Sequence, residues 1–220
     1  TWLMQGELDR AIETYREALP LARKVGDRSQ EATTLANLGE ALRTTGALAD
    51  AEKAFTDSAA LFRAMNDASS VAYVDTFLAD LLLVRNDLAG AEKKYREALA
   101  SRVVIEDKRQ TAETQIALGR VRLLQGRYVE ARRQLEPAFA YFRREAHPGR
   151  VATCHSIEAE AFAREGKPVD AKRAIAAPRH SRRLPTATGR ARRRPSGSSS
   201  TARCSRATSW RSSASPRCGR

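Results

Sequence analysis

Cysteine and histidine are scarce in this sequence, with three residues of each among 220. Three irregularly spaced cysteines provide no disulfide framework, and three scattered histidines provide no metal-ligand set. Cys154 and His155 are the only neighbouring nucleophile and base, but adjacent residues on a helix point about 100° apart. A glycine-rich phosphate loop is also missing. We therefore expect no enzyme activity, no cofactor and no metal site.

Long apolar runs are missing as well. The sequence contains no run of eighteen apolar residues, so it predicts no membrane-spanning helix. The chain does not open with a charged segment followed by an apolar one, as an export signal would. These two absences predict a cytoplasmic protein without membrane contact.

Acidic residues are absent from the last fifty positions. Residues 1–170 contain 25 Lys and Arg against 26 Asp and Glu, whereas residues 171–220 contain 14 Lys and Arg and no acid. The net charge of +13 therefore arises from the C-terminal segment alone.

What the sequence does contain is a pattern that returns every forty residues. A hinge residue is followed five positions later by alanine and nine positions later by a bulky apolar residue. A second alanine series runs at Ala32, Ala72, Ala112 and Ala152. Such self-similarity indicates a repeat array in which each unit stacks on its neighbours. The hinges are Gly6, Gly46, Asn86, Gly126 and Gly166, the alanines are Ala11, Ala51, Ala91, Ala131 and Ala171, and the bulky residues are Tyr15, Phe55, Tyr95, Leu135 and Ile175.

Each unit has the pattern of two helices joined by a tight turn. In the second unit, Asp27 with Gln30 three residues later predicts a helix start, and Gly46 predicts a left-handed helix end. Small residues at Gly39 and Ala51 allow the two helices to approach closely, with Phe55 filling the space beside them. The fold class we expect is all-α, an α-solenoid of antiparallel helix hairpins.

The units resemble tetratricopeptide repeats over residues 1–177. The resemblance rests on the hinge glycines and on a set of leucine, small, aromatic and serine residues in the second and fourth units. The forty-residue length is similar to the long units of kinesin light chains and of the sensor arrays of large bacterial transcriptional regulators. The resemblance implies a right-handed superhelix. The residues are Leu38, Gly39, Gly46, Ala51, Phe55 and Ser58, with Leu118, Gly119, Gly126, Tyr128 and Ala131.

The array is expected to comprise five units, the first one truncated. Residues 1–5 occupy the end of a first helix whose earlier turns are missing from the sequence. The apolar face of the next helix, with Ile12, Tyr15 and Leu19, would then lack a cover. We therefore expect the chain to be a fragment of a larger protein.

Residues 178–220 form an Arg- and Ser-rich tail. Few large apolar residues and a high net charge predict disorder. One interpretation is an arm that binds nucleic acid by neutralising phosphates. Another is a segment read out of frame, because the pattern stops abruptly and Pro178 falls within an expected helix. Translation of the gene in the other two frames distinguishes these interpretations.

The resemblance implies that the first helix of each unit lines a concave face that binds a protein or peptide. The leading hypothesis is thus an interaction scaffold or sensor module of a larger signalling or transcriptional regulator. The alternative is nucleic-acid binding, through the tail only, and an enzyme ranks third. The sequence does not predict an oligomeric state. The candidate partner-binding residues are Thr33, Asn37, Glu40, Arg43, Tyr73, Asp80, Glu113, Arg120, Glu160 and Arg164.

Overall fold

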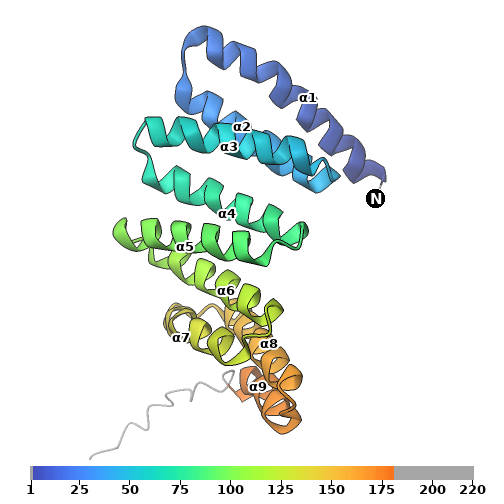
Figure 1. The fold of residues 1–220 in the computed structure, drawn as a ribbon, viewed down its shortest axis with the longest axis vertical. Helices are drawn as coiled ribbons and strands as arrows, with labels where there is room; N and C mark the ends of the chain where they lie inside the picture. Colours follow the sequence, from blue (N-terminus) through green and yellow to red (C-terminus); the bar gives the residue numbers. More distant parts are fainter. Residues whose placement is uncertain (1, 181–220) are drawn as a thin grey trace, which may run out of the picture. The chain divides into compact units, whose positions relative to one another are not determined.

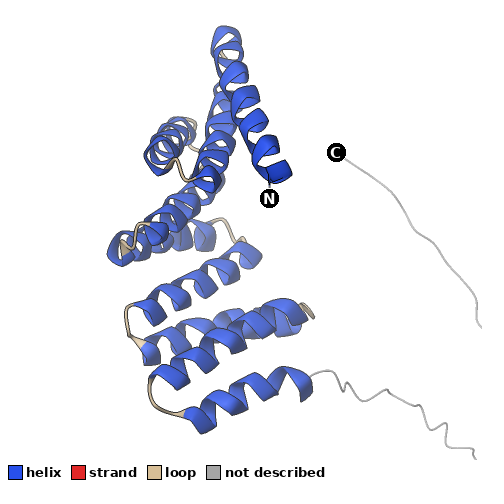
Figure 2. Ribbon diagram, turned by 90° about the vertical axis from the view of Figure 1, so that its right-hand side faces the viewer, coloured by secondary structure: helices blue, strands red, loops and turns tan. Residues whose placement is uncertain are grey.

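Helices are the regular elements throughout the part of the chain that the computed structural model describes, which is the backbone of residues 2–180 and the side chains of residues 6–176. Short turns join them (Figure 2). The helices are α1 (Trp2–Val25), α2 (Arg28–Thr45), α3 (Leu48–Ala64), α4 (Ala68–Val84), α5 (Leu88–Val104), α6 (Lys108–Leu124), α7 (Tyr128–Arg144), α8 (Pro148–Arg164) and α9 (Pro168–His180).

The helices follow one another in chain order, each packed against the next (Figure 1). We call α2, α4, α6 and α8 the first helices and α3, α5, α7 and α9 the second helices of their units. This serial packing confirms the predicted all-α solenoid of helix hairpins. The last helix ends at His180, shortly after the boundary expected at residue 177. The rest of the predicted tail, residues 181–220, lies outside the described residues.

One turn geometry recurs at every helix junction. The turn residue has a positive φ, and the amide of the following residue donates to a carbonyl five positions back, as Ala47 N does to Leu42 O at 2.9 Å. This is the pairing of a left-handed helix C-terminus. The predicted hinges at Gly46, Asn86, Gly126 and Gly166 are confirmed, with φ between 59° and 88°. A second series, halfway between them, comprises Gly26, Asn66, Glu106 and Ala146.

The hinge predicted at Gly6 is wrong, because α1 runs without interruption from Trp2 to Val25. The five residues before Gly6 are too few to form a helix that packs back on α1. Continuing the helix through glycine costs only about 1 kcal/mol relative to alanine. The prediction that the apolar face of this helix lacks a cover is also wrong in part. Ile12 and Leu19 are buried in one apolar cluster with residues of α2, such as Ala32.

Aspartates begin several helices as predicted. The carboxylates of Asp27, Asp67 and Asp107 each accept a hydrogen bond from a backbone amide three residues later, at 2.9–3.0 Å. Such caps satisfy amides that have no partner within the helix. The side chain of Gln30 does not complete a capping box, since it donates to Thr34 Oγ1.

Small residues on the first helices accept bulky residues from the second helices. A Cβ atom on Gly39 would lie 2.7 Å from the ring of Phe55, and one on Gly119 would lie 2.8 Å from Leu135 Cδ2. Phe55 and Leu135 are fully buried. The sequence expectation that these glycines permit close approach of the helices is therefore confirmed.

The last unit departs from the pattern of the others. Ala152 is exposed, although Ala32, Ala72 and Ala112 are buried. Ile175 is 59% exposed, whereas Phe55 at the same place is buried.

Candidate functional site

The ten predicted partner-binding residues all lie on first helices, spaced so that those of one helix share a face. The assignment by helix is Thr33, Asn37, Glu40 and Arg43 on α2; Tyr73 and Asp80 on α4; Glu113 and Arg120 on α6; and Glu160 and Arg164 on α8.

Two pairs of first helices contact each other directly. α2 contacts α4, and α6 contacts α8, although a second helix lies between them in sequence. Within the described part, no pair of second helices makes contacts of comparable extent. We call the side formed by α2, α4, α6 and α8 the first-helix face.

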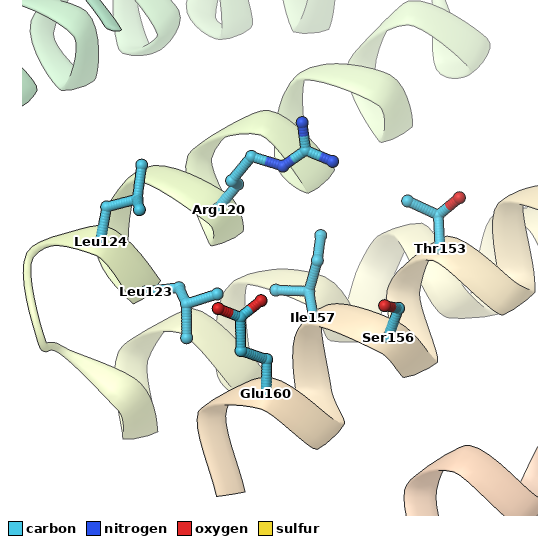
Figure 3. Close-up of a pocket in the computed structure, with 7 residues that line it drawn as sticks. All are labelled: Arg120, Leu123, Leu124, Thr153, Ser156, Ile157 and Glu160. Carbon is cyan, nitrogen blue, oxygen red and sulfur yellow. The ribbon is translucent and has the colours of Figure 1, made fainter. Parts of the chain in front are cut away.

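A hollow of about 370 Å³ lies between α6 and α8 (Figure 3). Its lining combines apolar and polar side chains from both helices. Two predicted residues, Arg120 and Glu160, line it, and so do the apolar residues Leu123 and Leu124. We call it the α6–α8 hollow.

A second hollow, of about 360 Å³, adjoins the first and shares Arg120 and Thr153 with it. Helices α4, α5, α6 and α8 all contribute to its lining, and we call it the central hollow. Asp80, Glu113 and Arg120 are the predicted residues that it brings together. Four predicted residues therefore line two adjoining hollows on one face.

The other predicted residues lie outside these two hollows. Tyr73 stacks edge-on against Phe77, with ring centroids 4.6 Å apart, and lines a third hollow with Ser70 and Ile105, which shares Arg102 with the central hollow. Thr33, Asn37, Glu40, Arg43 and Arg164 line neither the α6–α8 hollow nor the central hollow.

Several predicted residues are already engaged in ion pairs. Arg43 binds Glu40 through two hydrogen bonds of 2.6 and 2.8 Å. Glu160 pairs with Arg164 at 2.7 Å. Surface pairs of this kind contribute at most about 1 kcal/mol to stability. A partner can therefore compete for these side chains at little cost.

Two predicted residues have unused hydrogen-bonding groups. Asn37 is exposed, and its side chain makes no hydrogen bond to any other described residue. Arg120 is exposed and forms no ion pair within the described part of the chain. Both are available to a bound molecule.

Asp80 is held in the wall of the central hollow. The hydroxyl of Tyr95 donates a hydrogen bond to Asp80 Oδ1. Burial raises the pKa of the Asp80 carboxyl above its ordinary value, while the Tyr95 hydrogen bond and the charge of Arg43 act in the opposite direction. Burial and the Asp80 charge together raise the pKa of Tyr95. The pair is a fixed polar contact between α4 and α5.

Cys154 and His155 do not form a catalytic pair. Burial raises the pKa of the Cys154 thiol to about 12, so the sulfur is protonated and a poor nucleophile near neutral pH. His155 is buried, with its ring 4.6 Å from that of Phe139 and Nδ1 3.2 Å from Glu158 Oε2. Across residues 6–176, no group of three or more His, Cys, Asp or Glu is arranged to hold a metal ion.

Three buried charged residues were not predicted. Asp75 pairs with Arg63 and Lys94, each at 3.2 Å. Glu92 and Arg102 are 6% and 4% exposed. For Asp75 and Arg102, the sequence does carry a signal, which is a break in the forty-residue pattern. Asp75 stands where the second unit has Leu35, and Arg102 stands where other units have Phe62 and Phe142.

Glu92 links α5 to the turn between α6 and α7. Its carboxylate accepts hydrogen bonds from Gln125 and Arg127 at 3.0 Å and pairs with Arg96. Burial acts to raise the pKa of Glu92, but the Gln125 hydrogen bond and the charges of Arg96 and Arg127 outweigh it and lower the pKa. The carboxylate therefore connects α5 to the turn before α7.

No helix in the described part of the chain is both long and apolar enough to cross a membrane.

Comparisons with known proteins support the repeat assignment. The model of the tetratricopeptide repeat family matches residues 3–64 and 70–144. No curated protein sequence matches the chain.

Solved structures share the fold at low sequence identity. BtubC (BKLC) from P. vanneervenii is 18% identical, with a TM-score of 0.73 over 90% of this chain and 81% of that protein. A putative kinesin light chain from Podosopora anserina is 17% identical, with a TM-score of 0.68 over 81% of this chain and 89% of that one. MamA is 19% identical, with a TM-score of 0.60 over 81% and 91%.

These matches confirm the resemblance to tetratricopeptide repeats of the kinesin light chain type. The fold is one that serves as a scaffold for protein–protein interaction, and its members are typically not enzymes. Because the family model matches more than half of its length, the chain belongs to the tetratricopeptide repeat family.

Proposed function

We propose that the chain binds a protein or peptide on its first-helix face, as a scaffold or sensor module. The observation that carries the proposal is that Asp80, Glu113, Arg120 and Glu160 line two adjoining hollows on this face. Mixed charges around apolar side chains such as Leu123 suit a segment of another polypeptide.

The unpaired groups of Asn37 and Arg120 extend the proposed surface from α2 to α6. Asn37 can hydrogen-bond to a partner's backbone, and Arg120 can reach a carboxylate or carbonyl. Thr33, Tyr73 and the ion-paired Glu40, Arg43 and Arg164 complete the proposed contact residues.

A pull-down from a lysate of the organism that encodes the chain tests this proposal. Asn37→Ala with Arg120→Ala should abolish recovery of the partner that the unmodified chain captures. Lys53→Ala with Arg133→Ala, at exposed positions of α3 and α7, is the matched control and should leave recovery unchanged. Equal recovery by both double variants would exclude the first-helix face.

The resemblance to sensor arrays extends the proposal to a role within a larger signalling or transcriptional regulator, acting in the cytoplasm. The sequence of the full-length gene tests this role. A nucleotide-binding or DNA-binding domain encoded next to these repeats supports the role, and its absence counts against it.

A second candidate function is nucleic-acid binding through residues 178–220. The observation in its favour is that this segment contains 12 Arg and no Asp or Glu. Binding through phosphates weakens steeply with salt, with a slope of about 0.9 per phosphate neutralised on duplex DNA. A mobility-shift titration at two salt concentrations, with and without residues 178–220, tests it. Binding that survives the deletion contradicts it.

A further inference from the structure

The second helices α5 and α7 stand on either side of a hollow of about 750 Å³, about twice the volume of the α6–α8 hollow. The first half of α6 forms its floor. Gln115 in this floor lies about 200° around the helix from Glu113, so the hollow is on the side of α6 that faces away from the first-helix face. It shares Arg102 with the central hollow and no other lining residue. We call it the second-helix hollow.

The walls of this hollow have the spacing of a helix face that packs against another helix. The lining residues run from Lys108 to Gln115 on α6 and from Pro137 to Arg144 on α7. In both helices they stand at positions i, i+3, i+4 and i+7, which form one continuous stripe. A hollow bounded by two such stripes has the form of a groove that receives a further helix.

Two apolar residues of the hollow stand where other units carry charges. Val103 on α5 is 58% exposed, and Pro137 on the facing side of α7 is also exposed. The other units have arginine at the place of Val103 and an acid at the place of Pro137. The two exchanges make both walls apolar, as contact with another apolar surface requires. The charged counterparts are Arg23, Arg63 and Arg143 for Val103, and Glu17, Asp57 and Glu97 for Pro137.

The apolar surface continues past the hollow along the end of α5. Val103, Val104 and Ile105 are 58%, 81% and 38% exposed. Among residues 6–176, no other exposed large apolar residues are adjacent in sequence. Runs of three exposed apolar residues are avoided on surfaces that contact only water, and exposed apolar patches mark interaction sites.

The rim of the second-helix hollow is basic. Arg102, Lys108 and Arg144 line the hollow, against the single acid Glu106. Lys108 is exposed and forms no ion pair with any other described residue. Arg144 pairs with its neighbour Glu145 at 3.0 Å, and an exposed pair of this kind contributes little to stability. The rim therefore attracts a partner surface that carries acidic residues.

We propose that the second-helix hollow binds an amphipathic helix of another protein. The apolar side chains of this helix pack against Val103, Pro137 and Tyr141, and acidic residues beside them face Lys108 and Arg144. The volume of about 750 Å³ lies within the range of sites that bury several large side chains.

Charge disfavours two other occupants. Residues 181–220 of the chain itself contain 11 Arg and no Asp or Glu. A second copy that met this hollow in a two-fold pair would bring the same basic rim to it. A different protein with an acidic helix is the occupant whose charge matches. This inference goes beyond the proposed function, because the hollow lies away from the first-helix face.

The test uses the full 220-residue chain and three peptides of about 15 residues, a length at which an isolated helix is marginally stable. The acidic probe carries leucine at positions i, i+3, i+4 and i+7, with glutamate and alanine elsewhere. The basic probe has lysine in place of every glutamate. The polar probe has glutamine in place of every leucine and keeps the glutamates, so it measures any attraction to the basic C-terminal segment.

Calorimetric titration at physiological salt measures the affinities. The acidic probe should bind in a saturable way with a dissociation constant of about 0.1 mM or below. The basic probe should bind about tenfold more weakly or less, because its charges face the basic rim. The polar probe should show no comparable binding, because it has no apolar side chain to bury.

Three variants complete the experiment. Pro137→Glu restores the acid of the other units at an exposed helical position where glutamate is favoured over proline, so it should fold. It should weaken the acidic probe by about tenfold or more. Val103→Ser removes one apolar contact and should weaken it by about fivefold. Val129→Glu makes the same kind of change near the start of α7, outside the hollow, and should bind as the unmodified chain does.

No saturable binding of the acidic probe, or unchanged affinity in Pro137→Glu, would overturn the proposal. Equal affinity for the basic or the polar probe would do the same. If Pro137→Glu does not fold, Val103→Ser decides. A dimer of the unmodified chain that Pro137→Glu dissociates in sedimentation would show that a second copy fills the hollow, against the proposal. Asn37→Ala with Arg120→Ala should leave the acidic probe bound, so this proposal and the pull-down fail separately.

Discussion

Glu106 and Ala146 hold a backbone conformation that their side chains disfavour. Their φ values are 57° and 53°, in the left-handed region, where six other turn residues of the described chain are Gly or Asn. The left-handed conformation costs a residue with a Cβ atom about 1–2 kcal/mol. Both residues are exposed, so no packing compensates for this cost.

We expect Ala146→Gly to stabilise the protein by about 0.5–1 kcal/mol, since relief of strain exceeds the added freedom of the unfolded chain. Urea unfolding followed by circular dichroism measures it. Ala140→Gly, at an exposed helical position of α7, is the control and should destabilise by about 1 kcal/mol. Destabilisation by both variants would show that Ala146 is not strained.

Gly6 and Gly46 should respond to alanine with opposite signs. Gly6 is helical with open space at its Cβ position, so Gly6→Ala should stabilise by about 0.5–1 kcal/mol. Gly46 has φ 88°, so Gly46→Ala should destabilise by about 1–2 kcal/mol. Thermal unfolding of both variants measures the difference. If Gly6→Ala destabilises the protein instead, that result supports the hinge that the sequence pattern predicts at Gly6.

At the scale of helices, buried charged side chains form ion pairs that link one element to another. Asp75 lies between partners from α3 and α5, and Glu92 binds residues from α5 and from the turn before α7. Removing one partner of a buried pair leaves the others uncompensated. The stability of the junction at Glu92 therefore depends on the protonation of its carboxyl.

Glu92→Gln should destabilise the protein by about 1–3 kcal/mol near pH 7. The pKa of Glu92 is lowered in the folded state below its usual value of 4.5. Its contribution is therefore complete above about pH 4.5 and is lost as the pH falls through the folded pKa. Urea unfolding at pH 7 and at a series of lower pH values should show a difference from the unmodified chain that is largest at pH 7 and shrinks as the pH falls below 4.5.

Glu130→Gln is the control for that experiment. Glu130 also pairs with Arg127 but lies exposed, and its removal should have little effect at either pH. Equal losses for Glu92→Gln at both pH values would show that the residue acts through packing and not through its charge.

The elements were predictable from the sequence because their determinants are local. Gly46 ends a helix, Asp67 begins one, and both recur at a fixed interval. The interior of the central hollow was not predictable, because Arg102 belongs to a second helix while the pattern assigned partner contacts to first helices alone. The role of Glu92 depends on Gln125 and Arg127, more than thirty residues away, and pairings of that range are set by tertiary packing.

At the scale of the whole described array, the core is divided. Buried apolar residues form three clusters: one from α1 to α4 around Phe55, one around Tyr95, and one from α6 to α8 around Leu135. In arrays whose units contact only their neighbours, stability is a sum of unit and interface contributions. Damage to one cluster should therefore remain local.

Phe55→Ala and Leu135→Ala should each destabilise by about 2–5 kcal/mol, but in different places. Phe55→Ala should lower amide exchange protection mainly in α2–α4, and Leu135→Ala mainly in α6–α8. Hydrogen exchange measured by mass spectrometry resolves the two regions. A uniform loss along the chain for both variants would show that the array unfolds as one unit.

Because the eight turns between helices α1 and α9 share one geometry at twenty-residue intervals, this part of the chain is divisible into interchangeable blocks. Excising residues 67–106 would join Asn66 directly to Asp107, and thus a left-handed turn to a helix cap of the kind that Asp67 already provides. The excision would also take out Asp75, Glu92 and Arg102 together. A chain shortened by this whole block should keep its helicity per residue, whereas one shortened by thirty residues should lose it.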